Sequence, residues 1–227
     1  MPSEQVTPKY RTVIWDMDGV LIDSERHWNS LDSLFLEDVV NDWEAFDQSR
    51  LVGRSLGDIY ELLAEEYGIS ISKDEYLREY NRVARRIYGE KASLMPNVQQ
   101  TLHEIDALGV AQCLASSSSR EWIGYALERF PLGEFFDHIV SADDVGGRGK
   151  PDPAIYEYTC KTMACTKDAT IVIEDSEPGV KAAQGAGLTV IGYSHKDNTQ
   201  SLESAEFHVS DLLEIPEIVS GAGNTRH

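Results

Sequence analysis

The chain has 227 residues, with 20 basic and 39 acidic side chains and a formal net charge of −19 at pH 7. A charge of this sign disfavours binding to nucleic acid and to anionic membrane surfaces, so we expect neither as a partner. An anionic substrate would need a local positive charge or a metal ion against this background. A hydrophobic content of 41% supports one large domain, or one domain with an insertion.

The sequence shows no sign of a membrane span or of an oxidising compartment. No apolar run approaches the roughly 20 residues that a spanning helix needs. The first residues, MPSEQVTPKYR, contain no apolar core of a signal peptide. The spacing of Cys113, Cys160 and Cys165 indicates neither a zinc site nor a disulfide framework. We therefore expect a cytoplasmic protein, and we take a monomer as the default oligomeric state.

The first predicted strand carries two carboxylates at its carboxyl end. The residues Thr12–Trp15 are β-branched or aromatic, which is typical of a strand buried on both faces of a parallel sheet. Asp16 and Asp18 follow directly, where α/β folds place their binding sites. Buried carboxylates need partners, and Mg²⁺ is the simplest one. Gly19 lets Asp18 approach a ligand closely; the alternative is a plain polar turn.

The next part of the chain has a different pattern. From residue 25 to residue 91, apolar residues recur at helical spacing in three successive segments, and no strand pattern interrupts them. We predict a helical cap domain over residues 24–91, inserted into an α/β core formed by residues 1–23 and 92–220. Residues 221–227 are expected to form a flexible tail.

After the insertion, short apolar runs alternate with helical patterns of ten to fifteen residues. This alternation predicts right-handed crossovers and a Rossmann-like parallel sheet with helices on both faces. The predicted strands cover residues 12–15, 110–115, 138–140, 170–173 and 188–191, with a further candidate at 207–209.

Polar residues follow the predicted strands at positions that meet at one edge of the sheet. Besides the first aspartate pair, these are Ser116 after the second strand, Lys150 in the loop after the third, and Glu174 and Asp175 after the fourth. Taken singly, Ser116 or Asp175 could be a helix N-cap and Lys150 a solvated loop residue. Their coincidence at equivalent positions favours a functional site.

This set of side chains suits phosphoryl transfer, which depends on positioning and on stabilising charge. A metal held by Asp16 and Asp175 would neutralise one phosphoryl oxygen. Ser116 and backbone N–H groups at a helix start would hold another, and Lys150 would screen the nucleophile and the phosphate. Asp16 can then attack to form an acyl phosphate, while Asp18 acts as general acid and base.

The motifs DMDGVLIDS, LASSS, GKPDPAIY and IEDSEPGVKAA, in this order, resemble those of the haloacid dehalogenase-like hydrolases. The group that looks most similar contains the β-phosphoglucomutases and sugar-phosphate phosphatases. The resemblance implies that Asp16 is the nucleophile and a ligand of Mg²⁺, and that Asp18 is the acid and base and binds the metal through its backbone carbonyl. Glu174 and Asp175 would complete the metal site. The residues expected to bind phosphate or another part of the substrate are Gly19, His27, Arg54, Ser116, Ser117 and Lys150.

The resemblance also implies that the helical insertion closes over the site, excludes water from the first step and reads the substrate. Within it, Arg54 offers a planar donor for a phosphate or a sugar hydroxyl. His27 lies just after the connection to the core and could face the cleft. Each of these two residues has an equally ordinary interpretation as a surface residue on or before a helix.

Three activities fit such a site to different degrees. We favour a phosphatase for small phosphorylated sugars or related metabolites. A β-phosphoglucomutase is the alternative, but similar mutases have Tyr-His where this chain has His27-Trp28, and arginine where it has Leu56. A dehalogenase is disfavoured because a metal-binding acidic pair suits phosphate. A non-enzymatic receiver module is the remote alternative; receivers carry their phosphorylated aspartate on a middle strand and lack a helical insertion.

Overall fold

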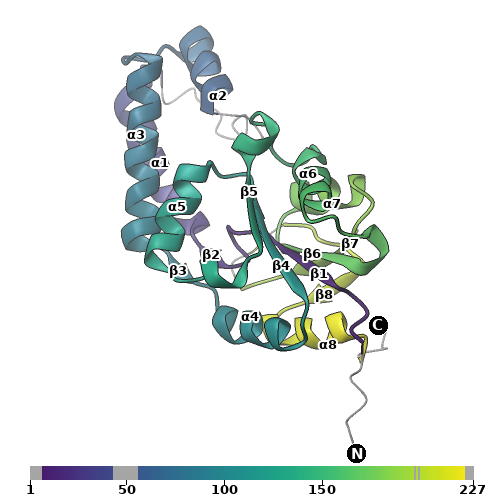
Figure 1. The fold of residues 1–227 in the computed structure, drawn as a ribbon. Helices are drawn as coiled ribbons and strands as arrows, with labels where there is room; N and C mark the ends of the chain where they lie inside the picture. The colour runs from purple at the N-terminus through teal and green to yellow at the C-terminus, as the bar shows by residue number, and fades with distance from the viewer. Residues whose placement is uncertain (1–6, 43–55, 197, 199, 223–227) are drawn as a thin grey trace, which may run out of the picture.

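The computed structural model describes residues 7–42, 56–196, 198 and 200–222, without the side chains of residues 29–34. Its centre is a six-stranded sheet in the order β5-β4-β1-β6-β7-β8 (Figure 1). Every neighbouring pair in this sheet is parallel. The predicted α/β fold is therefore confirmed, including the strand at 207–209. The strands are β1 (Thr12–Trp15), β4 (Ala111–Ser116), β5 (His138–Ser141), β6 (Thr170–Glu174), β7 (Thr189–Tyr193) and β8 (Phe207–Val209).

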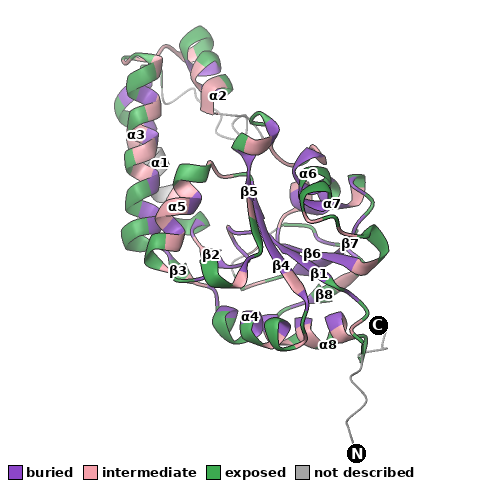
Figure 2. Ribbon diagram, in the orientation of Figure 1, coloured by how far each residue is buried: buried purple, intermediate pink, exposed green. Residues whose placement is uncertain are grey.

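Helices cover both faces of this sheet, which is why β1 reads as an unbroken apolar run. Because side chains alternate along a strand, Val13 and Trp15 pack on one face and Ile14 on the other. The first face contacts buried residues of α4, α5 and α8, and the second contacts those of α6 and α7. Figure 2 shows the central strands buried between these layers. The helices are α4 (Val98–Ala107), α5 (Arg120–Arg129), α6 (Ala154–Thr162), α7 (Glu177–Gly185) and α8 (Ile215–Ser220).

The described part of residues 25–91, called the helical insert below, projects from one end of the sheet (Figure 1). Its two ends meet in a short antiparallel pair, in which β2 (Ile22–Asp23) lies against β3 (Ser93–Leu94). The insert has its own small core of aliphatic and aromatic side chains, which includes Leu36, Leu63 and Tyr76. Its helices and helical turns are α1 (Glu25–Val39), α2 (Leu56–Leu62), η3 (Leu63–Tyr67), α3 (Lys73–Arg86) and η4 (Ile87–Lys91).

Local signals in the sequence explain where several of these helices begin and end. Ser72 caps α3 by accepting a hydrogen bond from the Glu75 N–H at 3.3 Å. Gly109 follows α4 with a positive φ of 68°, a conformation that glycine adopts without strain. None of the helices in the described ranges is both long and apolar enough to cross a membrane.

Candidate active site

A cavity of about 520 Å³ lies at the carboxyl edge of the sheet. The parallel register explains its position: Trp15 pairs with Leu114 on one side and with Ile173 on the other, so the residues after these three strands emerge at the same level. The predicted residues Asp16, Asp18, Ser116, Ser117, Lys150 and Asp175 all line the cavity. Residues from four separate parts of the sequence are thus brought together, as the sequence predicts for this edge.

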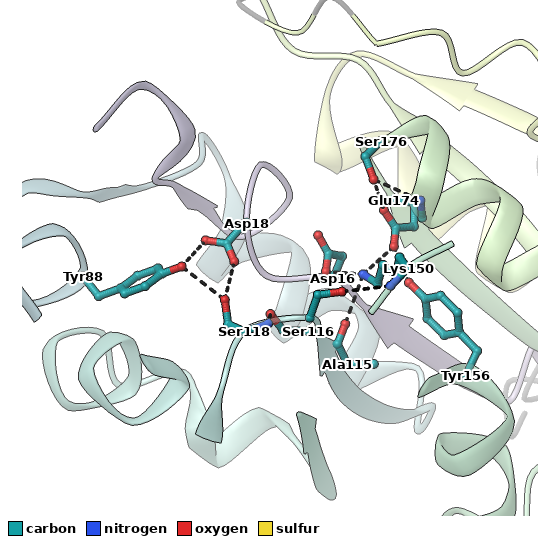
Figure 3. Close-up of polar contacts among 12 residues, drawn as sticks. Asp16, Asp18, Tyr88, Ala115, Ser116, Ser118, Lys150, Tyr156, Glu174 and Ser176 are labelled. Carbon is teal, nitrogen blue, oxygen red and sulfur yellow. Dashed lines mark hydrogen bonds and ion pairs between the residues drawn. The ribbon is translucent and has the colours of Figure 1, made fainter. Parts of the chain in front are cut away.

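Lys150 joins two carboxylates at the floor of the cavity. Its Nζ atom lies 2.5 Å from Asp16 Oδ1 and 2.6 Å from Glu174 Oε1, and only 7% of its side chain is exposed. Burial alone would lower the pKa of Lys150, but the two carboxylates hold that pKa well above its ordinary value. Lys150 is therefore a buried cation fixed beside Asp16, and not the solvated loop residue of the alternative interpretation (Figure 3).

Asp16 is surrounded by negative charge. Burial raises its pKa, the cation of Lys150 opposes this effect, and the carboxylates of Glu174, Asp175 and Asp18 add to it. Carboxylates that are packed this closely need a further positive charge to remain ionised together.

The carboxylates of Asp16, Glu174 and Asp175 fit a divalent cation. Each offers one oxygen, and these oxygens all lie within 4.8 Å of one another. Asp175 Oδ2 is buried and accepts no hydrogen bond in the described structure, which leaves it available as a ligand. An all-oxygen, mainly carboxylate donor set is the kind that Mg²⁺ and Ca²⁺ prefer. The Asp18 carboxylate is not part of this cluster.

Two glycines make room for the two carboxylates at the carboxyl end of β6. A Cβ atom on Gly19, whose φ is +80°, would lie 1.8 Å from Asp175 Oδ2. A Cβ atom on Gly179 would lie 1.9 Å from Glu174 Oε2. Glu174 is fully buried and is bonded by Lys150, by the Tyr156 hydroxyl and by Ser176 Oγ at 3.2 Å, so it has little room to move.

We expect Gly179→Ala to destabilise the protein by roughly 1–3 kcal/mol, because the new methyl group displaces the bonded carboxylate of Glu174. The matched control is Gly124→Ala in α5, where a Cβ atom meets nothing within 4 Å. The control should be neutral or more stable by up to about 1 kcal/mol. Urea unfolding of both variants measures the difference. Equal stability of the two would mean that the pocket around Glu174 is not tightly packed.

The serines that begin at the end of β4 have two different structural roles. Ser119 is the N-cap of α5 and accepts a hydrogen bond from the Trp122 N–H at 3.3 Å. Ser116 is buried and accepts a bond from the Ser118 N–H at 3.1 Å. Ser117 Oγ accepts a bond from the Lys150 N–H at 3.4 Å. Ser116 and Ser117 thus lie at the strand end beside Lys150 without capping the helix.

Asp18 is held apart from the Lys150 cluster by hydroxyl groups (Figure 3). Its Oδ1 atom accepts hydrogen bonds from Ser24 Oγ at 2.5 Å and from the Tyr88 hydroxyl at 2.8 Å, and its Oδ2 atom accepts one from Ser118 Oγ at 3.1 Å. Burial raises the pKa of Asp18, and these hydrogen bonds oppose the rise. The carboxylate therefore faces the cavity in a fixed position.

The residues expected from the helical insert are placed less directly. Arg54 lies outside the described residues. His27 is on α1 with its Nε2 atom 3.3 Å from Arg26 Nε, and it is not among the residues that line the cavity. Leu56 and Asn81 of the insert do line it.

Several residues at the site were not predicted from the sequence. Trp122 lines the cavity and donates from Nε1 to Asn81 Oδ1 at 2.7 Å. Tyr88 and Tyr156 contact Asp18 and Glu174, and His195 Nε2 lies 3.6 Å from Asp175 Oδ2. An aromatic residue at helical spacing predicts a packed core, and nothing in the sequence marks which aromatic residue reaches a carboxylate.

The sequence and the fold are similar to those of known proteins. Residues 13–193 match the model of the haloacid dehalogenase-like hydrolase family. The phosphorylated carbohydrates phosphatase of Thermotoga maritima is 28% identical over 82% of this chain and 86% of its own length. The validoxylamine A 7'-phosphate phosphatase of Streptomyces hygroscopicus subsp. limoneus is 27% identical over 91% of this chain and 96% of its own length.

A solved structure has the same fold. CbbY from Rhodobacter sphaeroides, in complex with phosphate, superposes with a TM-score of 0.73 at 22% identity, over 91% of this chain and 96% of that one. The family model covers well over half of the sequence and includes the segments that carry Asp16, Ser116, Lys150 and Asp175. The chain belongs to the haloacid dehalogenase-like hydrolases, as its motifs predict.

Proposed function

We propose that this hydrolase is a Mg²⁺-dependent phosphatase that releases inorganic phosphate from small phosphomonoesters, above all phosphorylated sugars, through an aspartyl phosphate on Asp16. The observation that carries the proposal is the contact of Asp16 with the buried Lys150, at the floor of the cavity and beside the carboxylates of Glu174 and Asp175. The names of the relatives from Thermotoga and Streptomyces support a phosphorylated carbohydrate or a related compound as the substrate.

In the first step, a carboxylate oxygen of Asp16 forms a bond to phosphorus while the bond to the leaving oxygen breaks. Lys150 reduces the repulsion between this carboxylate and the phosphoryl group. Ser116 Oγ and the Ser117 amide hold the phosphoryl oxygens. Asp16, Glu174, Asp175 and the backbone carbonyl of Asp18 would hold a Mg²⁺ ion, which would supply positive charge to neutralise the phosphoryl group. Asp18 gives its proton to the departing alcohol.

In the second step, Asp18 acts in the opposite direction. Its carboxylate, now ionised, takes a proton from a water molecule that attacks the phosphorus of the aspartyl phosphate. The bond between phosphorus and the Asp16 oxygen breaks, and inorganic phosphate leaves. The three hydroxyl groups around Asp18 orient its carboxylate for both transfers.

The helical insert serves as the cap in this proposal, with residues 24–91 as the cap domain between the core segments 1–23 and 92–220. Asn81 and Leu56 bring the insert to the wall of the cavity. Closure of this wall would exclude water until the phosphoryl group has been transferred. We retain Arg54 as a substrate-binding candidate that mutagenesis can test.

The mutase alternative is not favoured. Similar mutases have Tyr-His at the positions where this chain has His27-Trp28. The Trp28 side chain packs against other aromatic rings. The centroid of its ring lies 4.9 Å from the ring centroid of Trp122 and 6.1 Å from that of Tyr88. Similar mutases have an arginine at the position where this chain has Leu56. Membership of the hydrolase family likewise speaks against a receiver module.

The direct test is a panel of phosphomonoesters assayed with Mg²⁺ and scored for both inorganic phosphate and isomerised product. We expect phosphate release with turnover numbers of about 1–10³ s⁻¹ on good substrates, with activity lost in EDTA and restored by Mg²⁺. The kcat/KM values for hexose and pentose phosphates should exceed those for phosphate esters of hydroxycarboxylic acids. Isomerisation of a sugar phosphate without phosphate release would contradict the phosphatase and support the mutase.

A further inference from the structure

The Tyr88 hydroxyl lies in an unusual place for a residue of the helical insert. Tyr88 belongs to η4, which ends the insert, and its side chain is fully buried. Its hydroxyl lies 2.8 Å from Asp18 Oδ1 and 3.3 Å from Ser118 Oγ, and Figure 3 shows it pointing at both. Trp28 of α1 donates to the same hydroxyl from Nε1 at 3.3 Å. One phenol thus connects two parts of the insert to a carboxylate and a serine of the core.

The contacts of Asp18 assign a direction to this bond. When Asp18 is ionised, Tyr88 donates to it, because an ionised carboxylate offers only acceptors and the Trp28 N–H already supplies the phenol oxygen with a donor. A hydrogen bond to an ionised group is short and directional, so it fixes the orientation of that group. Tyr88 itself does not line the cavity, whereas Asp18 and Ser118 do. Tyr88 therefore acts on the cavity through them.

We propose that Tyr88 is a positioning residue for Asp18: the phenol hydroxyl, delivered by the insert, holds the carboxylate that exchanges protons with the leaving group and the water. This inference rests on the proposed function, in which Asp18 is the acid and base. It adds that the position of the insert determines the orientation of the Asp18 carboxylate through one hydrogen bond. A displaced insert would leave Asp18 with Ser118 of the core and Ser24 of the connecting segment, and with no donor from η4.

The variant Tyr88→Phe removes the hydroxyl and keeps the ring. The matched control is Tyr60→Phe. The Tyr60 hydroxyl donates a hydrogen bond within the insert, to the Ile71 carbonyl at 3.1 Å, and it makes no hydrogen bond to Asp18. The readout is kcat/KM for two aryl phosphates. The phenol of phenyl phosphate needs a proton on its oxygen in order to leave. The p-nitrophenolate of p-nitrophenyl phosphate leaves readily without one.

For Tyr88→Phe we expect kcat/KM on phenyl phosphate to fall about tenfold or more, from the loss of a hydrogen bond to a charged group, and kcat/KM on p-nitrophenyl phosphate to fall far less. Tyr60→Phe should change neither value appreciably. An equal fall on both substrates would mean that Tyr88 has only a structural role and would overturn the proposal. A rise in activity would overturn it too, since the bond would then withhold Asp18 from the reaction.

A second experiment needs no turnover. Urea unfolding of Tyr88→Phe, Asp18→Ala and the double variant forms a cycle that measures the coupling between the two side chains. We expect the change in the free energy of unfolding of the double variant to differ from the sum of the two single changes. Additive changes would show that the two side chains are not coupled and would overturn the proposal. If the wild-type protein releases no phosphate from any ester, the proposed function fails, while this cycle still decides whether Tyr88 holds Asp18.

Discussion

Asp16→Asn is expected to lower kcat by a factor on the order of 10⁴ or more, since removal of a nucleophile eliminates the covalent route. The asparagine amide cannot form the acyl phosphate. Glu174 also lies next to Lys150 and Asp175, but it is fully buried, does not line the cavity and is bonded by Tyr156, so it is not placed to attack instead. The variant should still fold. Asparagine has nearly the same shape, and Lys150 keeps its ion pair with Glu174 at 2.6 Å.

Phosphate release from p-nitrophenyl phosphate measures the loss, and circular dichroism with thermal unfolding checks the fold. Asp106→Asn on α4 is a suitable control, because Asp106 is exposed and its substitution should leave activity unchanged. Mg²⁺-dependent phosphatase activity retained in Asp16→Asn would rule out the assignment of the nucleophile. Loss of activity together with loss of the native circular dichroism spectrum would leave the fold, and not the chemistry, as the cause, and Asp16→Ser would then replace the asparagine variant.

The sequence predicted the sheet well because its strands are short apolar runs that end in polar residues. Burial on both faces requires such runs, so β1, β4, β6 and β7 stand out without any knowledge of the fold. The pair formed by β2 and β3 was not predicted. Two residues per strand are too few to show a period, and their pairing depends on where the ends of the insert meet.

The same logic explains which site residues could be predicted. Asp16 and Asp175 directly follow a strand and Ser116 ends one, and parallel strands bring their carboxyl ends to one edge. Tyr88 is 70 residues from Asp18 in the sequence, inside a helical pattern whose aromatic residues all look like core. Its contact depends on how the insert packs against the sheet, which periodicity does not determine.

Asp18→Asn is expected to trap the aspartyl phosphate on Asp16. Asparagine cannot accept the proton of the attacking water, so the second step should slow by about 10²–10⁴-fold. With p-nitrophenyl phosphate the leaving group needs no proton, so the first step can still proceed. Intact-protein mass spectrometry after an acid quench should then show one added phosphoryl group in Asp18→Asn and much less in the wild type.

Two further variants make this result specific. Asp16→Asn combined with Asp18→Asn should carry no phosphoryl group, because the acceptor is missing. Ser118→Ala keeps the Asp18 carboxylate and its bonds from Ser24 and Tyr88, so it should turn over and show no comparable accumulation. A burst of p-nitrophenol equal to the enzyme concentration would confirm that the first step survives in Asp18→Asn. Slow turnover without that burst and without a phosphorylated protein would contradict the division of roles, because Asp18 would then be needed before the phosphoryl group reaches Asp16.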